Sequence, residues 1–310
     1  MTNETDAIPA FAAREFSVQD RLWVHMNAVL EQINAGRVIS GMCRLQVLLS
    51  ERRRQLRGPD WTRFVQTEVL THGIRDIVHA DPFTYRAFSK PRGYAGDAVM
   101  MDYIYGYREK EMRSLPDPVG RVFDYCTGTA APQAVRFRRQ VVAENIDAAA
   151  ARGARPIDVV ALAAGHLREV DLSLAARTGG AAITAIDQDE ASLDQIGEDY
   201  SQYGVQTIAA SVRDVLTGRR QLPASDLSYT AGLYDYLPDS AATRLTTVMF
   251  EALRPGGTLL LANFLPNILD AGYMESLMDW HLIYRGDDEM RELAGGVPPG
   301  DIAAIEQFHD

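Results

Sequence analysis

The sequence of 310 residues has little cysteine and no excess of basic charge. Its two cysteines, Cys43 and Cys126, lie far apart, which favours free thiols in a reducing compartment over a disulfide framework. Lysine and arginine number 31 against 42 aspartates and glutamates, so the net charge of −11 argues against nucleic acid as the main partner. The basic run Arg52–Arg57 is better explained as a solvated helix face.

Long apolar runs and metal-ligand spacings are also missing. No stretch approaches the ~18 apolar residues that a membrane span needs, and the acidic, polar N-terminal residues are not those of a signal peptide. The six histidines show no ligand spacing, so we expect no metal. We therefore expect a cytoplasmic protein that binds a small molecule and neither membrane nor nucleic acid. The sequence leaves its oligomeric state open.

The first half of the chain has the apolar periodicity of helices. Glycine and proline after the last of them, at Gly153 and Pro156, indicate a domain boundary. We expect residues 1–153 to form an all-helical cap and residues 154–310 a ligand-binding domain. The predicted helices are Ser17–Ala35, with Ser17 as N-cap, then Val38–Leu56, Asp60–His79 and Ala131–Arg152.

The second half alternates between strand and helix patterns, which predicts a doubly wound, mostly parallel α/β sheet. Ligands of such sheets bind beyond the carboxyl ends of the strands. Helices are predicted at about Leu167–Arg177, Glu190–Tyr200 and Ala241–Leu253. Strands are predicted at Ile157–Ala163, Ala182–Ile186, Gln206–Ala210, Leu227–Thr230 and Thr258–Phe264, with Ile302–Phe308 as a sixth.

The segment from Ile157 to Asp187 carries the strongest signal. It runs strand, glycine turn, helix, strand and acidic residue, with Gly165 and Asp187 about 20 residues apart. The glycine allows close approach of backbone to a ligand, and the carboxylate accepts hydrogen bonds from ribose hydroxyls. A dinucleotide enzyme normally has three glycines in this turn, whereas this chain has one, followed by His166.

From Ile157 to about Phe264 the order of these signals resembles the class I S-adenosylmethionine-dependent methyltransferases. The Leu253–Gly257 segment (LRPGG), which would turn into strand five, is its most distinctive piece. The resemblance implies S-adenosylmethionine as cofactor. Two positions depart from the family pattern, because Ala161 and His166 stand where an acidic residue and a glycine are usual. The cofactor-binding residues it implies are Ala163 and Gly165 for the methionine moiety, Asp187 with Gln188 for the ribose, Ser211, Val212 and Arg213 for the adenine, and Tyr229 to Tyr236, including Gly232, beneath the sulfonium.

A narrower resemblance concerns Lys90–Asp97 (KPRGYAGD), Asp279–Arg285 (DWHLIYR), GHLRE at 165–169 and GLYDYL at 232–237. These segments resemble a bacterial subgroup that includes carboxyl methyltransferases of 3-hydroxy fatty acids, and azetidine-2-carboxylate synthases are built on a similar scaffold. The resemblance implies methyl transfer to a small-molecule acceptor, a carboxylate of a hydroxy or fatty acid. One alternative is cyclisation of S-adenosylmethionine to azetidine-2-carboxylate and methylthioadenosine. A non-catalytic S-adenosylmethionine-binding protein is the other.

Five residues are candidates for the reaction itself. Tyr234 and Asp235 would line the reaction centre, and Tyr94 would close over the sulfonium, where an aromatic face favours a cation. His166 could act as a base near neutral pH, donate to the cofactor carboxylate, or be structural. Asn263 could orient the acceptor or the cofactor amine.

The segment around Arg92 has two compatible interpretations. As a lid, it would bring the Arg92 guanidinium to a carboxylate of the cofactor or substrate. As a plain turn, it would let Asp97 cap a helix at Ala98–Tyr105. Arg168 and Glu169 fit a charge pair on a solvated face as well as a functional role. Trp280 fits core packing better than an active-site wall.

Overall fold

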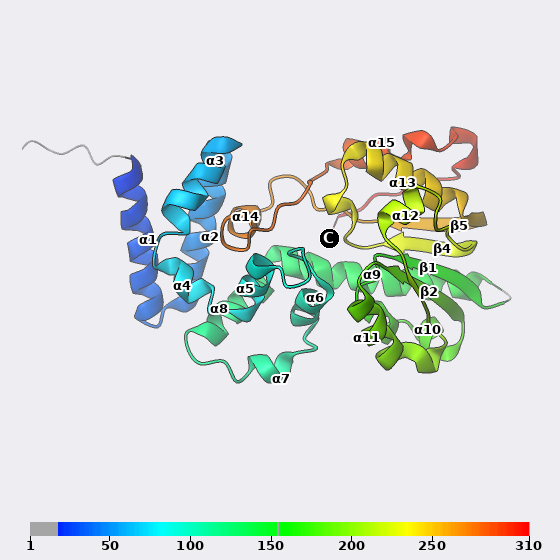
Figure 1. Cartoon of the computed structure of the whole chain (residues 1–310), viewed down its shortest axis with the longest axis horizontal. Coiled ribbons are helices and arrows are strands. Elements are labelled where there is room, and N and C mark those ends of the chain that lie inside the picture. The colour runs from blue at the N-terminus through cyan, green and yellow to red at the C-terminus, as the bar shows by residue number, and fades with distance from the viewer. Residues whose placement is uncertain (1–17, 154, 310) are drawn as a thin grey trace, which may run out of the picture.

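The computed structural model describes residues 18–153 and 155–309, with side chains described from Trp23 onward. A helical layer lies at one end and a sheet covered by helices at the other (Figure 1). The predicted Ser17 cap and the predicted start of the first helix lie outside the described residues.

The helical first half is confirmed, with one helix broken into pieces. The predicted Asp60–His79 helix divides into α3 (Pro59–Phe64), a π-turn at Val65–Val69 and α4 (Ile74–Val78). The Thr67 and Thr71 hydroxyls donate to carbonyls four residues back, at 3.0 and 2.7 Å, which weakens the regular ladder ahead of Gly73. The other helices here are α1 (Val18–Asn34), α2 (Val38–Gln55), α5 (Pro82–Ser89), α6 (Ala98–Tyr105), α7 (Glu109–Met112), α8 (Val119–Gly128) and α9 (Ala130–Arg152).

The sheet has five parallel strands in the order β3-β2-β1-β4-β5. One apolar core packs it against α9, α10 and α11 and a second against α12 and α13, so both faces are covered and the predicted doubly wound fold is confirmed. The strand order reverses between β1 and β4, which puts a ligand crevice at their carboxyl ends. The strands are β1 (Ile157–Leu162), β2 (Ala181–Asp187), β3 (Gln206–Ala209), β4 (Ser225–Thr230) and β5 (Leu253–Leu261).

The helices of this half are α10 (Leu174–Thr178), α11 (Glu190–Tyr200), α12 (Val212–Leu216), α13 (Asp239–Glu251), α14 (Ala271–Leu277) and α15 (Asp287–Glu292). The predicted helix at Leu167–Arg177 is wrong in extent. Leu167 is left-handed (φ 54°), a 3-10 turn covers Arg168–Asp171, and the Ser173 hydroxyl caps α10 by accepting from Ala176 N–H at 3.1 Å.

Two expectations for the end of the sheet are wrong. The strand predicted at Thr258–Phe264 begins earlier, because β5 starts at Leu253, before the glycine pair. The predicted tight turn at the glycines is instead an irregularity within the strand, where the pairing with β4 shifts between Ser225 and Leu227. Ile302–Phe308 is no strand, because its backbone joins no ladder among the described residues. It is held instead by side chains, with Gln307 Nε2 donating to the Asp287 carbonyl at 2.9 Å.

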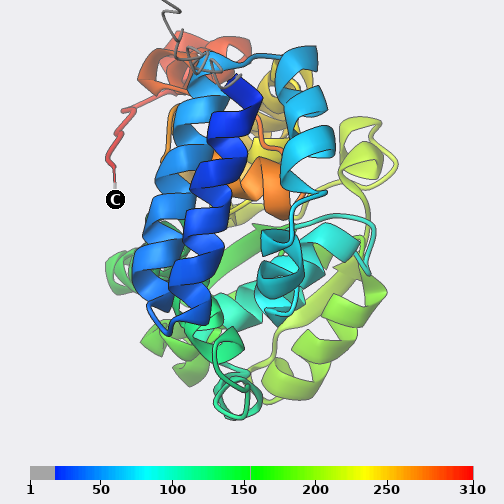
Figure 2. The same cartoon turned by 90° about the vertical axis from the view of Figure 1, so that its left-hand side faces the viewer.

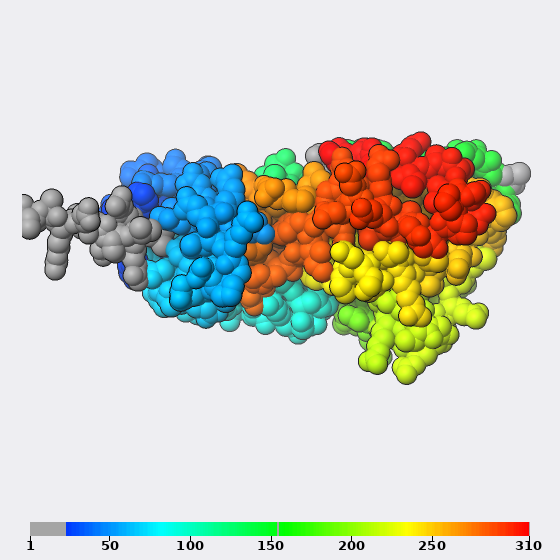
Figure 3. All heavy atoms as spheres, turned by 90° about the horizontal axis from the view of Figure 1, so that it is seen from above, coloured from blue at the N-terminus to red at the C-terminus, as the bar shows by residue number. Residues whose placement is uncertain are grey.

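The helical layer is not made by the N-terminal half alone. Phe264, Tyr273 and Trp280 belong to its core, so the chain returns to it after β5. α14 lies against α2, and a Cβ on Gly272 would come within 2.6 Å of the Leu49 carbonyl carbon, so only glycine permits this contact. Figure 2 looks onto α1 and α2, and Figure 3 shows the returning segment between the helical layer and the sheet. The domain boundary after residue 153 stays a prediction.

Candidate functional site

The turn after β1 and the acidic end of β2 meet at the switch point of the sheet. Ala163, Gly165 and Leu167 all have positive φ, at 55°, 56° and 54°, so the backbone curls sharply beside β2. Gly165 N–H donates to Asp187 Oδ2 at 2.9 Å, and Asp189 N–H donates to Oδ1 at 2.9 Å. Asp187 is only 7% exposed, and burial raises its pKa while these bonds lower it. Each carboxylate oxygen is thus oriented and keeps a free lone pair for a hydroxyl donor.

The segment at 90–97 folds over this carboxylate. Arg92 NH1 donates to Asp189 Oδ2 at 2.7 Å and to the Ser192 hydroxyl at 2.9 Å, so it is ion-paired with the protein itself. Burial raises the pKa of the Tyr94 phenol, and the neighbouring charges of Asp187 and Asp189 raise it further. Arg92, Tyr94 and Asp187 are therefore brought together, and Arg92 is paired with Asp189 of the protein itself; its predicted contact with a cofactor or substrate carboxylate stays a prediction.

The same segment is anchored at both ends as the turn interpretation predicts. The Asp97 carboxylate caps α6 by accepting from Met100 N–H at 2.9 Å, which confirms that interpretation, and it also binds Arg86. Gly96 lies against Trp280 and Tyr236, because a Cβ there would stand 2.7 Å from the Tyr236 hydroxyl. Trp280 Nε1 donates to that hydroxyl at 2.7 Å.

His166 belongs to a buried polar network. His166 is 4% exposed, and its Nδ1 lies 2.9 Å from Asp102 Oδ2 on α6. Its Nε2 lies 3.5 Å from Arg92 NH1, a donor, so the neutral ring carries its proton on Nδ1. Asp102 also accepts two bonds from Arg168, which ties α6 to the turn after β1. Arg168 is 6% exposed and bonded to Asp199, so the solvated-pair interpretation of Arg168 and Glu169 is wrong.

Glu169 is an acidic residue in the 3-10 turn that follows β1. It accepts a hydrogen bond from the Tyr229 hydroxyl, which reaches it from β4. Burial raises the pKa of Glu169, and that of Tyr229 rises well above its usual range for the same reason. The Tyr105 ring, which carries Arg139 over its face at 4.9 Å, adds an aromatic wall. The sequence left Glu169 open between a functional role and a solvated charge pair, and it gave no sign of the contact with Tyr229.

The residues after β4 divide between site and core. Asp235 is 2% exposed, accepts from Phe264 N–H at 2.8 Å, and lies 3.9 Å from Arg138 NH1. Burial raises the pKa of Asp235 to about 6, against the lowering effect of Arg138. Tyr234 was predicted to line the reaction centre, but its side chain packs in the core under α13, with its hydroxyl 2.8 Å from Thr246 Oγ1.

The remaining predicted residues have other surroundings. Asn263 Nδ2 donates to the carbonyls of Phe264 and Ile283, and its Oδ1 accepts from Arg285, so it fastens the returning chain to β5. Ser211 caps α12 in a capping box with Asp214. The other predicted cofactor-binding residues lie at the surface beyond the strand ends. Gln188, Arg213 and Ala163 are exposed, Val212 is half-buried, and Gly232 lies near Arg138, whose NH1 a Cβ would meet at 3.8 Å.

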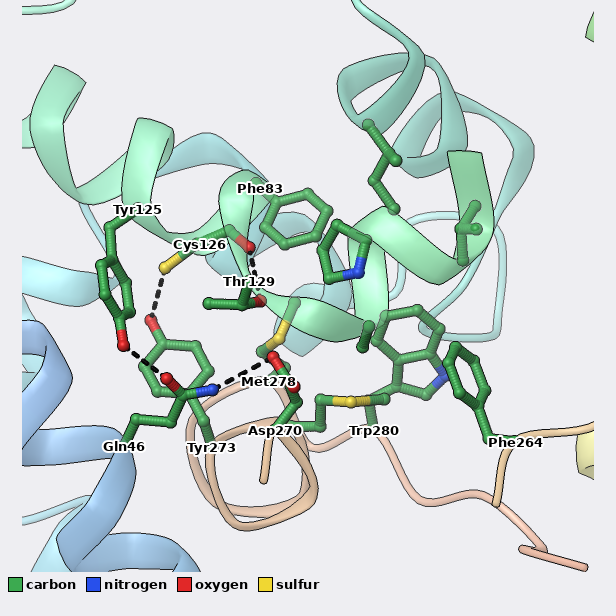
Figure 4. Close-up of a pocket in the computed structure, with 15 residues that line it drawn as sticks. Gln46, Phe83, Tyr125, Cys126, Thr129, Phe264, Asp270, Tyr273, Met278 and Trp280 are labelled. Atoms are coloured by element: carbon green, nitrogen blue, oxygen red, sulfur yellow. Dashed lines mark hydrogen bonds between the residues drawn. The ribbon is translucent and has the colours of Figure 1, made fainter. Parts of the chain in front are cut away.

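An apolar cavity of about 30 Å³ lies in the helical layer (Figure 4). Phe264 and Trp280 form one end of its lining, where Arg138 stacks over the Phe264 ring at 4.9 Å. A more open pocket of about 320 Å³ adjoins it. Both are lined by Gln46, Tyr125, Thr129 and Asp270. The cavity therefore leads from the surface toward the ends of β4 and β5, and Trp280 is both core and wall.

Other classes of site find no support among the described residues. No group of three or more histidine, cysteine, aspartate or glutamate side chains is arranged to hold a metal. Within residues 18–153 and 155–309, no helix is both long and apolar enough to cross a bilayer.

The sequence matches no protein-family model and no curated protein. Several solved structures share part of the backbone course. A protein from Bordetella parapertussis described as a possible exported protein has 18% identity and a TM-score of 0.49 over 64% of this chain and 71% of its own. A family 2 O-methyltransferase from Planctomyces limnophilus has 15% identity and a TM-score of 0.37 over 59% and 64%. Magnesium protoporphyrin IX methyltransferase from Synechocystis has 12% identity and a TM-score of 0.42 over 64% and 86%.

Proposed function

We propose that this chain is an S-adenosylmethionine-dependent enzyme that methylates the carboxylate of a largely apolar small molecule. The observation that carries the proposal is the apolar cavity, which runs from a surface pocket to Phe264 and Trp280 beside the ends of β4 and β5. The apolar lining suits the chemistry of an acyl or similar chain, since burying each methylene group there would gain about 0.8 kcal/mol. At about 30 Å³ the cavity would have to widen when such a chain enters.

The cofactor half of the proposal rests on the strand ends. The two Asp187 oxygens, each oriented by a backbone N–H, would accept hydrogen bonds from the two hydroxyls of a ribose. Ser211 and Val212, after β3, would flank the adenine. The Glu169 carboxylate and the Tyr229 hydroxyl would hold the ammonium group of the methionine end, in place of the acidic residue absent at Ala161. When bound, the cofactor supplies an activated methyl group on a sulfonium.

The chain's own residues would position the acceptor and exclude water. A carboxylate is ionised at neutral pH and needs no base, so no proton has to be moved. Arg138 does not itself line the cavity, but its guanidinium lies over the Phe264 ring that does and 3.9 Å from Asp235, and its charge would attract an acceptor carboxylate to this end. Gly96, Trp280 and Tyr236 pack together beside the segment over Asp187, and this packing would keep bulk water from the reacting atoms.

The cyclase remains a second candidate. The observation in its favour is the dense aromatic packing of Tyr94, Tyr236 and Trp280 beside a cavity of only about 30 Å³. Cyclisation needs no acceptor and therefore no route from the surface. The outer pocket of about 320 Å³ that adjoins the cavity is unexplained by that reaction, which is why we prefer methyl transfer.

Product analysis separates the candidates. The protein is incubated with S-adenosylmethionine, with and without a saturated medium-chain acid. We expect S-adenosylhomocysteine and the methyl ester only with the acid. Methylthioadenosine and azetidine-2-carboxylate formed without acid would refute methyl transfer and establish the cyclase. Cofactor binding with neither product, across acids of several lengths, would leave a non-catalytic binding protein.

A larger side chain in the cavity lining tests whether the acceptor binds in the cavity. Ala131, in the cavity lining, is replaced by leucine, which adds three carbons to the enclosed space. We expect methylation of the acid to fall by about 10-fold or more while cofactor affinity is kept. Ala148→Leu, on the exposed face of the same helix α9, is the matched control and should change neither. Equal loss of cofactor binding and turnover in Ala131→Leu would contradict the assignment of the cavity to the acceptor.

A further inference from the structure

One polar group in the cavity has no role in the methyl transfer proposed above. Asp270, just before α14, lines both the inner cavity and the outer pocket. It is 4% exposed, and its Oδ1 accepts from Gln46 Nε2 at 3.1 Å. Gln46 Oε1 in turn accepts from the Tyr125 hydroxyl (Figure 4). Asp270 Oδ2 makes no hydrogen bond with any described residue.

Burial is the main influence on Asp270 and raises the pKa of its carboxyl group, while hydrogen bonding from the Thr129 hydroxyl and the Ala131 N–H opposes that rise. Neither donor reaches hydrogen-bond geometry with Oδ2. The Thr129 hydroxyl proton is committed to the Cys126 carbonyl at 3.1 Å. α9 begins at Ala130 without a side-chain cap, and its first turn lines the same cavity as Asp270. The positive end of the helix dipole there favours an anion. A buried carboxylate oxygen left unpaired is destabilising, and a donor in the cavity would remove that cost.

The charges along the cavity give it a direction. Asp124 lies exposed on the rim of the outer pocket, and neither cavity is lined by lysine or arginine. Arg138 lies at the opposite end, over Phe264. The carboxylate of an acid in the cavity would therefore be attracted toward Arg138 at the strand ends and repelled by Asp270 and Asp124 at the other end. A hydrogen-bond donor on the far end of the molecule would meet the free oxygen.

We propose that Asp270 is a specificity-determining residue that binds a hydroxyl or ammonium group at the end of the acceptor remote from its carboxylate. The inference rests on the proposed function, since it assumes that the acceptor occupies the cavity. It names the substrate class more closely: a carboxylic acid with an apolar middle and a polar donor at the far end.

Equilibrium binding tests this without requiring turnover. Calorimetry on the full chain compares a saturated medium-chain acid with its ω-hydroxy and ω-amino derivatives of equal length. We expect the ω-substituted acids to bind wild-type protein about 10-fold more tightly, the value of one hydrogen bond to a charged group. Asp270→Asn should abolish the preference for the amine, and Asp270→Leu the preference for both. Asp124→Asn removes the same charge from the exposed rim and should change each affinity less than about 2-fold.

The outcomes separate this inference from the proposed function. Equal binding of the three acids to wild-type protein would overturn the inference, because Oδ2 would then serve a bound water or the start of α9. A preference that survives Asp270→Leu in protein with an unchanged melting temperature would overturn it as well. Preferential binding without any methyl ester would support the donor site while refuting methyl transfer.

Discussion

Asp187 gives the sharpest test of the nucleoside site. In Asp187→Asn the side chain keeps its shape and loses its charge and one acceptor oxygen. Oδ1 and Oδ2 each accept one backbone N–H, from Asp189 and Gly165, at 2.9 Å. Whichever way the amide turns, its NH₂ group faces one of these donors and can no longer accept from a ribose hydroxyl.

The loss can be estimated from these contacts. The variant loses one of the two hydrogen bonds from ribose hydroxyls to the charged carboxylate, which costs about 1.5–3 kcal/mol of binding free energy. The other hydrogen bond is weakened because its acceptor is no longer charged. S-adenosylmethionine should therefore bind roughly 10- to 100-fold more weakly, as measured by calorimetry. Asp194→Asn, on the exposed face of α11, is the control that removes the same charge and should bind as wild type.

The pH dependence gives a second readout of the same variant. Burial raises the pKa of Asp187, and ribose binding uses the ionised form. Cofactor affinity should therefore fall on acidification at a higher pH than an ordinary aspartate would give, and Asp187→Asn should lose that fall. An unchanged dissociation constant in the variant, together with an unchanged acid limb, would refute the placement of the ribose at this carboxylate.

Three further variants test the surroundings of the site. Gly96→Ala places a Cβ 2.7 Å from the Tyr236 hydroxyl, so turnover should fall and the free energy of unfolding drop by about 1–3 kcal/mol. Gly197→Ala, inside α11 with open space around it, should instead raise the free energy of unfolding by about 0.5–1 kcal/mol in the same urea titration. Asp102→Asn leaves buried Arg168 and His166 without their shared carboxylate and should cost about 3 kcal/mol, seen as a lower melting temperature; a change below 1 kcal/mol would contradict the network. The folded pKa of Asp235, about 6, lies above its ordinary value of 3.8, so its contribution to stability is present below pH 3.8 and lost as pH rises through 6. Asp235→Asn should then reduce the loss of stability between about pH 4 and 7 by at most about 3 kcal/mol, and a pH profile that matches wild type would show that Asp235 does not titrate there.

The sheet half of the fold was predictable because its signals are local. The apolar runs that end at Leu162 and Asp187 specify buried parallel strands, and the glycine turn between them specifies where the ligand crevice begins. The meeting of Gly165 with Asp187 follows from that geometry. The helix predicted at Leu167–Arg177 failed because a left-handed Leu167 and the Ser173 cap restart the chain there.

The rest of the site depends on contacts across long sequence separations. The Asp102–Arg168 pair and the Tyr229–Glu169 bond join residues about 60 positions apart, so no spacing rule reveals them. Tyr234 and Tyr236 alternate in sequence, yet the 3-10 turn that contains them sends the first into the core and the second toward Trp280. Side-chain direction in such a turn follows from packing against α13, which the sequence does not encode locally.

The return of the chain to the helical layer after β5 has a consequence for how the molecule folds. The walls of the cavity come from α2, from the α8–α9 junction and from residues 264–280, the last of which emerge directly from β5. The lining of the cavity is therefore complete only when segments from before and after the sheet are both in place. We expect the helical layer and the sheet to unfold together in one transition, because removal of either part would expose apolar side chains of the other.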